Sequence, residues 1–364
     1  MRIAELDVIP IALPFAHPYV SATGRLERRE MLLVRIECSD GTIGWGDAVP
    51  LSLRGGPGMA AVRRELEGAC RPELVGTAIG AEPARLAAGA RARCRARGAG
   101  RQAGSAIDIA LLDLCGKLEG RPAWRLLGAR AAAPVACNAS IGADPPELAA
   151  PAAVSAVRAG FGTIKVKVGD AGELDRVGAV RAAAGPGALL RVDANGSWDV
   201  ASATDRIASL EPLGIELVEQ PGATAADLAA VRAATAVPVV ADESVGDLAT
   251  ATAAMRLGAF DAATLKLAKV GGPHAAVEIA AAVPAYLSSA LDSAVGIAAA
   301  AHTAQAMRRR GFAAGRAHGL ATSPLFADNL TDDGHLSGPE IEVGDAPGLG
   351  VDVEPEAVER LRLR

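Results

Sequence analysis

The chain has 364 residues and a mass of 36.7 kDa, and its net charge is −5. This length is typical of two domains or of one large barrel with an addition, and the mild acidity excludes a binder of nucleic acid. The five cysteines form neither a CxxC motif nor a Cys/His metal pattern, which argues against a disulfide framework or a zinc site. Neither a secretory signal nor an uninterrupted apolar span is visible, so we expect a cytoplasmic protein without a membrane partner.

Residues 1–128 are predicted to form an α+β domain. Their first half alternates as strands do, and Ser39-Asp40-Gly41 joins two of the expected strands as a hairpin. The polar segment Phe15–Arg29 is expected to be a loop. The second half has apolar positions at helical spacing. The expected strands are 2–13, 31–38 and 42–47, and the expected helices are 59–67, 82–97 and 103–118.

A different pattern begins near residue 134, where short apolar runs alternate with amphipathic helical stretches. Most runs are rich in Val, Ile and Leu, as strands buried on both faces are, and they recur every 22–30 residues or so, roughly one β/α unit. Eight such units over about 200 residues favour a (β/α)8 barrel over a doubly wound sheet, whose glycine fingerprint is missing. The runs are 135–140, 163–168, 189–193, 215–219, 237–242, 263–267, 285–291 and, weakly, 315–320.

Polar side chains end five consecutive runs of this pattern. The carboxyl ends of parallel barrel strands meet at one rim, where barrel enzymes have their active sites. A single acid at such a place is usually a helix N-cap, and a single lysine is usually a surface residue with a buried stem. Capping does not explain five equivalent positions in a row. These positions are Lys165 with Lys167, then Asp193, Glu219, Asp242 and Lys266.

Three carboxylates at one rim repel one another unless a cation lies between them. All-oxygen ligands indicate a hard cation, and a site with room for water and substrate suits Mg²⁺. Only five of the 37 basic residues are lysines, and unlike arginine a buried lysine near a cation can lose its proton near neutral pH. The pattern therefore predicts abstraction of a proton α to a carboxylate, with a lysine as the base and the metal stabilising an enediolate intermediate.

The same motifs resemble the enolase superfamily and, within it, the muconate lactonizing enzyme subgroup. They are Lys-x-Lys at 165–167, Asp-Ala-Asn at 193–195, Glu-Gln-Pro at 219–221, Asp-Glu-Ser at 242–244 and Lys-Leu-Ala-Lys-Val-Gly-Gly at 266–272. The resemblance implies an α/β fold, a modified (β/α)7β TIM barrel with an N-terminal α+β capping domain that the C-terminal tail completes. The expected boundaries are 1–128 for the cap, 129–324 for the barrel and 325–364 for the tail.

The resemblance also implies residue roles. Asp193, Glu219 and Asp242 would bind Mg²⁺, with Mn²⁺ as a substitute, and Lys167 and Lys266 would be acid/base groups on opposite faces of the substrate. Lys165 would tune Lys167, whereas the role of Lys269 is left open beside that of a surface lysine. The expected substrate contacts are Asn195, Ser289 and Asp292, and His17 and Tyr19 if the loop Phe15–Arg29 closes over the site rather than merely connecting strands.

Members of this subgroup that share the core catalyse different reactions on small-molecule carboxylates. Segments 288–297 and 319–325 most resemble one short-chain branch of the o-succinylbenzoate synthases, so we expect that dehydration. A racemase or epimerase of N-acyl amino acids or dipeptides, a muconate-type cycloisomerase and, remotely, a non-catalytic metal-binding barrel are the alternatives. The absence of an Asp-x-Asp motif near Leu320–Thr322 disfavours an Ala-Glu dipeptide epimerase. The resemblance further implies a homo-oligomer.

Overall fold

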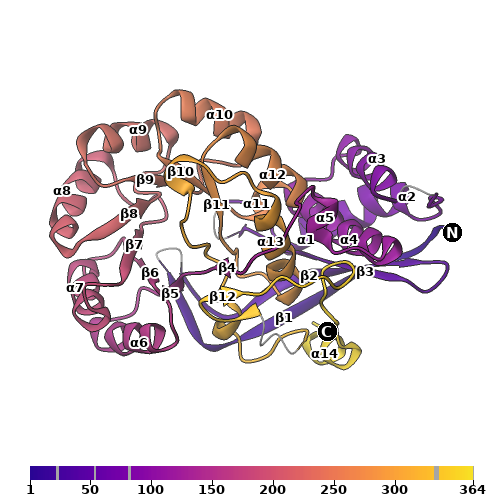
Figure 1. Ribbon diagram of the computed structural model, residues 1–364, viewed down its shortest axis with the longest axis horizontal. Helices are drawn as coiled ribbons and strands as arrows, with labels where there is room; N and C mark the ends of the chain where they lie inside the picture. The colour runs from indigo at the N-terminus through magenta and orange to yellow at the C-terminus, as the bar shows by residue number, and fades with distance from the viewer. Residues whose placement is uncertain (22–23, 53–54, 81–82, 332–335, 364) are drawn as a thin grey trace.

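The computed structural model of the protein describes residues 1–21, 24–52, 55–80, 83–331 and 336–363. Figure 1 shows a curled sheet of parallel strands surrounded by helices, and beside it a long antiparallel sheet that carries its own helices. The last segment of the chain runs from the curled parallel sheet back to the antiparallel sheet. The predicted fold class, a modified barrel with an α+β cap, is confirmed by this arrangement.

The cap is an antiparallel sheet in the order β1-β2-β3, with the long helix α4 packed against β3 and β2. A second core, separate from that of the barrel, fills the space between this sheet and the cap helices. The elements are β1 (Ile3–Ser21), β2 (Gly24–Cys38), β3 (Ile43–Ala48), α1 (Met59–Glu65), the π-helical turn η2 (Leu66–Cys70), α2 (Arg71–Leu74), α3 (Pro83–Ala96), α4 (Arg101–Glu119) and α5 (Ala123–Leu126).

Two glycines let β3 lie directly on α4. A Cβ atom on Gly46 would lie 2.2 Å from the carbonyl oxygen of Ala106, and one on Gly44 would lie 2.3 Å from that of Ala110. We expect Gly46→Ala to push strand and helix apart and to lower the free energy of unfolding by about 3 kcal/mol, the upper part of the range for overpacked cores. Urea unfolding measures the change.

Gly104, within α4, is the matched control for this prediction. A Cβ atom there meets nothing within 4 Å, and alanine is the better helix former, so Gly104→Ala is expected to leave stability unchanged or to raise it. Equal stability of the Gly46→Ala and Gly104→Ala variants would show that the close approach of β3 to α4 is not required.

The expected loop Phe15–Arg29 is wrong, because β1 and β2 continue as a hairpin arm. Tyr19 pairs with Leu26 beyond a register shift that follows Pro14. The polar residues and the glycine of this segment suggested a loop, and its one proline, Pro18, lies between Pro14 and Tyr19, where the register with β2 is interrupted. The ring of Phe15 stacks on Phe326 of the tail at a centroid distance of 4.9 Å, so the arm lies against the barrel side of the molecule.

The barrel sheet has the strand order β11-β10-β9-β8-β7-β6-β5, and its neighbouring strands are parallel. Its strands are β5 (Ala139–Ile141), β6 (Thr163–Lys167), β7 (Leu189–Asp193), β8 (Ile215–Glu219), β9 (Val239–Ala241), β10 (Ala262–Leu265) and β11 (Ala285–Leu287). Its helices are α6 (Pro146–Arg158), α7 (Glu173–Ala184), α8 (Val200–Leu210), α9 (Ala225–Ala234), α10 (Leu248–Arg256), α11 (Leu267–Val270), α12 (Pro273–Ala282) and α13 (Ala294–Ala306), with short 3-10 turns at Glu211–Leu213, Gly311–Ala313 and Ser323–Leu325.

The ring is closed by single residues rather than by the eighth strand expected at 315–320. His318 forms a parallel bridge with Cys137, and Gly319 forms one with Ser288 next to β11. A Cβ atom on Gly319 would lie 2.7 Å from the hydroxyl oxygen of Ser288. The segment around His318 and Gly319 thus pairs with each neighbour through a single bridge, which is too short to form a strand.

The tail joins the barrel to the cap. Its strand β12 (Glu340–Ile341) pairs antiparallel with β4 (Val135–Ala136), the first part of the run expected at 135–140. The helix α14 (Pro355–Leu361) then packs against β1, and the N–H of Leu363 donates to the carbonyl of Pro10 at 2.9 Å. The tail therefore holds the cap and barrel together through both backbone pairing and side-chain packing.

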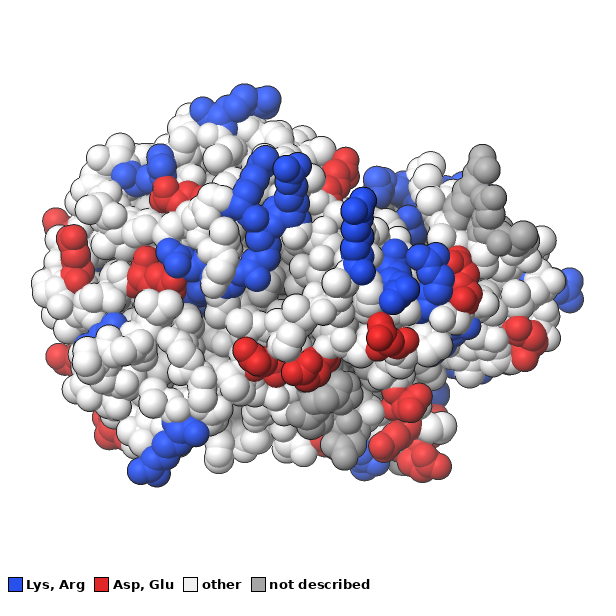
Figure 2. Space-filling view, in the orientation of Figure 1, with Lys and Arg blue, Asp and Glu red and all other residues white. Residues whose placement is uncertain are grey.

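Charges of both signs lie on the surface. Figure 2 shows basic side chains across the middle of one face, with acidic side chains beside and below them. In the ranges that the structure describes, no helix is long and apolar enough to cross a membrane.

Candidate active site

Six side chains singled out in the sequence meet at the carboxyl ends of β6 to β10. Lys165 and Lys167 lie on β6, Asp193 and Glu219 are the last residues of β7 and β8, and Asp242 and Lys266 directly follow β9 and β10. Lys167, Asp193 and Glu219 are successive partners across the sheet. All six are buried, and Asp193 and Asp242 have no exposed surface.

On one side of the site, Lys165 and Lys167 share the carboxylate of Asp193. The Nζ atoms of Lys165 and Lys167 lie 2.7 and 2.6 Å from its Oδ2, and Lys165 also donates to Oε1 of Glu219 at 2.7 Å. Burial raises the pKa of Asp193, but the two ammonium groups outweigh burial and hold it well below its usual value. Burial lowers the pKa of Lys165, but Asp193 and Glu219 raise it well above its usual value instead.

On the other side, two lysines share the carboxylate of Asp242. Lys266 donates to its Oδ2, and Lys269 donates to its Oδ1 at 2.6 Å. The side chain of Lys269 is only 11% exposed, so Lys269 is not a surface lysine. The three buried carboxylates therefore each have an ammonium group as a direct partner.

The turns after β7 and β8 hold strained residues that support the site. Asn195 and Gln220 have positive φ angles of 47° and 42°, a region that few non-glycine residues adopt. Asn195 accepts a hydrogen bond from Lys167 at 2.8 Å, so it positions that lysine rather than forming part of the cavity wall. Oε1 of Gln220 accepts from the N–H of Asp242 at 2.7 Å. Gln220 was not predicted as a site residue, although it stands in the Glu-Gln-Pro motif.

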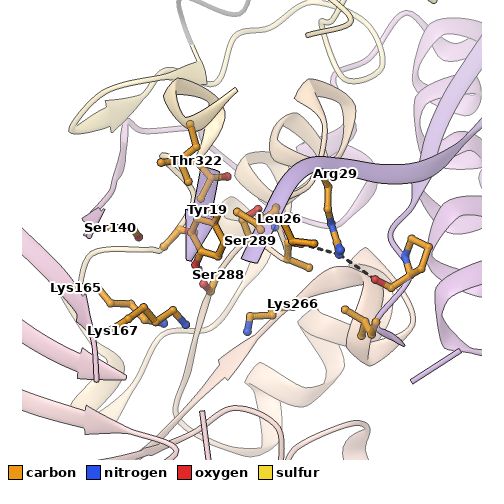
Figure 3. Close-up of a pocket in the computed structure, with 16 residues that line it drawn as sticks. Tyr19, Leu26, Arg29, Ser140, Lys165, Lys167, Lys266, Ser288, Ser289 and Thr322 are labelled. Carbon is orange, nitrogen blue, oxygen red and sulfur yellow. Dashed lines mark hydrogen bonds between the residues drawn. The ribbon is translucent and has the colours of Figure 1, made fainter. Parts of the chain in front are cut away.

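A cavity opens above the three lysines and is covered by the hairpin arm and a loop after β11. Figure 3 shows Tyr19, Leu26 and Arg29 of the arm on its upper side, with Lys165 and Lys167 opposite Lys266 below. Its remaining polar lining consists of hydroxyl groups from Ser140, Ser288, Ser289 and Thr322. Arg29, Ser140, Ser288 and Thr322 were not predicted, although Ser288 adjoins the predicted Ser289 and Arg29 ends the segment expected to close over the site.

The expected substrate contacts have different positions. Tyr19 and Ser289 line the cavity, whereas His17 is exposed on the arm and is not among the lining residues. The carboxylate of Asp292 accepts from the Ser289 hydroxyl and from the N–H of Ala290, both at 2.7 Å. Asp292 therefore shapes the loop that carries Ser289, since its hydrogen bonds point back into the loop.

Asp47 of the cap is buried against this same loop. Its Oδ2 accepts from the N–H of Ser293 at 3.0 Å and from the Ser293 hydroxyl at 2.7 Å. Burial and then the neighbouring charge of Asp292 raise the pKa of Asp47 to about 7, against the lowering effect of the hydrogen bonds from Ser293 and Gly296. Cap and barrel are thus joined at a carboxyl group that is uncharged below neutral pH.

This raised pKa predicts a pH-dependent stability. The folded state binds the Asp47 proton more tightly than the unfolded state, in which the pKa of Asp is about 3.9. As the pH rises from about 4 to 7, the free energy of unfolding is therefore expected to fall by an amount on the order of a few kcal/mol. Asp47→Asn removes the charge and is expected to flatten this part of the profile and to stabilise the protein at pH 8. Urea unfolding from about pH 4 to 8 is the measurement, and a parallel decline in both proteins would contradict the assignment.

The donor set fits a divalent cation. It consists of the oxygens of three buried carboxylates, the kind of ligand that Mg²⁺ prefers. In the described ranges no three Asp, Glu, His or Cys side chains converge on one point as ligands, because these carboxylates turn to the lysines. The site therefore offers ligand oxygens of the kind that Mg²⁺ takes, on carboxylates that are each paired with a lysine in this structure.

Two family models cover most of the chain. Residues 3–128 match the mandelate racemase/muconate lactonizing enzyme N-terminal domain, and residues 147–357 match the enolase C-terminal domain-like family. Among curated relatives, the hydrophobic dipeptide epimerase of Enterococcus faecalis is 32% identical over 96% of this chain and 99% of its own length. The o-succinylbenzoate synthase of Mycobacterium tuberculosis is 43% identical, but over only 48% of this chain and 53% of its own.

Solved structures agree with these families over the whole chain. N-succinyl Arg/Lys racemase from Bacillus cereus has a TM-score of 0.90 at 26% identity and covers 100% of this chain and 99% of its own. The Enterococcus faecalis dipeptide epimerase, complexed with Mg and the dipeptide L-Leu-L-Tyr, has a TM-score of 0.87 at 28% identity, covering 97% of this chain and 100% of its own. The chain belongs to the enolase superfamily, as an enzyme of its mandelate racemase/muconate lactonizing group.

Proposed function

We propose that the enzyme removes a proton α to the carboxylate of a small molecule, with Asp193, Glu219 and Asp242 as ligands of Mg²⁺. The observation that carries this proposal is the pair of lysines, Lys167 and Lys266, whose ammonium groups point toward each other across the floor of the cavity (Figure 3). The chemistry that Mg²⁺ supplies when bound is electrostatic stabilisation of an enediolate.

The chain's own residues divide the remaining tasks. Lys167 is the base that takes the α proton, and its hydrogen bond to Asn195 fixes the direction of its ammonium group. Lys266 stands on the opposite side, where it returns a proton in a racemisation or stabilises negative charge in a dehydration. Lys165 forms an ion pair with both Asp193 and Glu219 and so offsets the repulsion between these two carboxylates.

The lining of the cavity favours a substrate with an acyl group rather than an ammonium group at its far end. Among the described residues that line it, none is Asp or Glu, and Arg29 adds a positive charge. The hydroxyl of Thr322 is buried without a hydrogen-bond partner in the structure. A carbonyl or carboxylate oxygen of the substrate would satisfy that hydroxyl, whereas an amine of a dipeptide would find no carboxylate to pair with.

Dehydration to o-succinylbenzoate is the reaction that we assign first. A stretch of 181 residues, 48% of this chain, is 43% identical to o-succinylbenzoate synthase. Racemisation of N-succinyl or other N-acyl amino acids is the second candidate, because a structure named as an N-succinyl Arg/Lys racemase superposes on the whole chain and Lys266 is placed to act on the opposite face.

Three substrates distinguish these reactions. The protein with Mg²⁺ is mixed with the cyclohexadiene carboxylate precursor of o-succinylbenzoate, with N-succinyl amino acids and with hydrophobic dipeptides. Loss of the precursor's ultraviolet absorbance supports the synthase, and α-deuterium incorporation from deuterated water supports the racemase. Turnover of dipeptides alone would contradict the acyl specificity.

A single substitution in the cavity is expected to shift the substrate preference of the enzyme from succinyl compounds toward dipeptides. Thr322→Asp places a carboxylate where the acyl group is proposed to bind, so we expect kcat/KM for the succinyl substrate to fall at least about tenfold, the cost of one buried polar mismatch, and dipeptide epimerisation to rise. Thr322→Val, which keeps the shape and loses only the hydroxyl, is the control and should lower kcat/KM without any gain on dipeptides. Unchanged succinyl turnover in Thr322→Asp would place the acyl group elsewhere.

A further inference from the structure

Lys269 contacts Asp242, one of the proposed metal ligands, without lining the cavity. It belongs to α11, three residues after Lys266, and it is not among the residues that line the cavity. Its Nζ donates to Oδ1 of Asp242 at 2.6 Å, to the main-chain oxygen of Asp242 and to that of Thr264 at 3.2 Å. These contacts use all three N–H donors of the ammonium group.

The contacts of Lys269 fix how the carboxylate of Asp242 is turned. One oxygen, Oδ1, is held by Lys269, and the other, Oδ2, faces Lys266. Lys269 also ties the end of β9, at Asp242, to β10, at Thr264. We infer that Lys269 is a positioning residue, which sets the orientation of Asp242 for Mg²⁺ and for Lys266. This inference rests on the proposed function, in which Asp242 is a metal ligand.

The identity of residue 269 supports this role. Three oxygen atoms surround a single nitrogen, an arrangement that suits a compact ammonium group and not a planar guanidinium. Elsewhere the chain supplies positive charge almost entirely with arginine. A site that needed only charge could use arginine as well, so we expect Lys269→Arg to resemble Lys269→Met rather than the unchanged protein.

Lys117 provides a matched control. It lies at the end of α4 in the cap, and its Nζ donates to the buried Asp113 at 2.8 Å and to the main-chain oxygen of Ile43 at 2.9 Å. Lys117 thus also joins a buried carboxylate to a strand, but far from the proposed active site in the fold. Lys117→Met reports on the loss of such a contact without any change near Asp242.

Calorimetric titration of Mg²⁺, without substrate, into the full-length protein and its Lys269→Met, Lys269→Arg and Lys117→Met variants tests the inference. We expect both Lys269 variants to bind Mg²⁺ about 10- to 100-fold more weakly, as is usual when a partner of a metal ligand is lost, and Lys117→Met to bind it normally. Steady-state kinetics at saturating Mg²⁺ should still show a lower kcat, because Lys269 also orients Asp242 for Lys266, with KM for the carboxylate changed less than kcat.

Each result is decisive. Mg²⁺ binding by both Lys269 variants with the affinity of the unchanged protein would overturn the positioning role, and Lys269→Arg decides the question if circular dichroism shows that Lys269→Met is unfolded. An equal loss of affinity in Lys117→Met would also overturn it, because the effect would then be general. An unchanged protein that binds no Mg²⁺ would instead refute the proposed function.

Discussion

Lys167→Ala is expected to lower turnover of every substrate by about 10³-fold, within the range for loss of a general acid or base, and Lys266→Ala is expected to do the same only in a racemisation. Lys167 is the base in every reaction that we consider, so its loss should affect all substrates. In the N-acyl racemisation, Lys266 delivers or takes the proton on the other face and its loss should be equally severe. In the dehydration, where Lys266 only stabilises charge, its loss should be milder. Initial rates with each substrate give these values.

Lys117→Ala is the control for both lysine variants, since it also removes a lysine that pairs with a buried carboxylate. It is expected to retain most of the activity. Circular dichroism should show all three variants to be folded. If Lys167→Ala kept more than a tenth of the turnover on its best substrate, another group would have to be the base.

Asp193→Asn is expected to abolish Mg²⁺ binding and to lower activity by about 10³-fold or more, because a carboxylate ligand is replaced by a neutral amide. The fully buried side chain also pairs with both Lys165 and Lys167. Losing its charge leaves two buried ammonium groups with fewer partners, so we expect the free energy of unfolding to fall by about 3 kcal/mol as well. Calorimetric titration and urea unfolding measure the two effects.

Removal of the metal from the wild-type protein separates the loss of activity from the loss of stability. Treatment with a chelator should abolish activity without the loss of stability caused by Asp193→Asn, and added Mg²⁺ should restore it. Asp261, a partly exposed acid that pairs with Arg232 at the surface, provides the control variant Asp261→Asn, which should bind Mg²⁺ normally. Full activity in the presence of chelator would refute a metal-dependent mechanism.

The central part of the barrel could be predicted almost to the residue. The runs expected at 189–193 and 215–219 match β7 and β8, because a buried apolar run ends there at a carboxylate and then a turn. The hairpin arm and the closure of the ring, which were not predicted, depend on contacts between segments that are distant in the sequence. The hairpin arm depends on stacking between Phe15 and Phe326, residues more than 300 positions apart, and the eighth position of the ring depends on the close approach of Gly319 to Ser288.

The same distinction applies to the site. The spacing of Lys167, Asp193 and Glu219 predicts that they are neighbours, because equivalent ends of consecutive parallel strands lie side by side, and they are partners in the sheet. Arg29 and Thr322 could not be found in this way, since they reach the cavity from the cap and from the segment that closes the ring. The repeating motif thus predicts the chemistry, whereas contacts between distant segments determine which substrate fits.

The contribution of Lys269 was hidden for a related reason. A lysine three residues after another on a short helix is typical of an exposed position, and only the fold shows that its ammonium group turns inward to Asp242. Asp47 is similar, because a single acid at the end of a cap strand gives no sign of the barrel loop that it contacts. Lys269 contacts Asp242 and Asp47 contacts Ser293, and the spacing of residues along the sequence does not predict such contacts between distant segments.

Exchange of the substrate's α proton with deuterated water, followed by proton NMR, tests the two-lysine mechanism most directly, because it reports the proton transfer at each lysine itself. With Mg²⁺ and an accepted N-succinyl amino acid, the unchanged protein should exchange the proton of both enantiomers. Lys167→Ala and Lys266→Ala should each lose exchange of the enantiomer whose proton faces the missing lysine. Exchange of both enantiomers in both variants would contradict the mechanism.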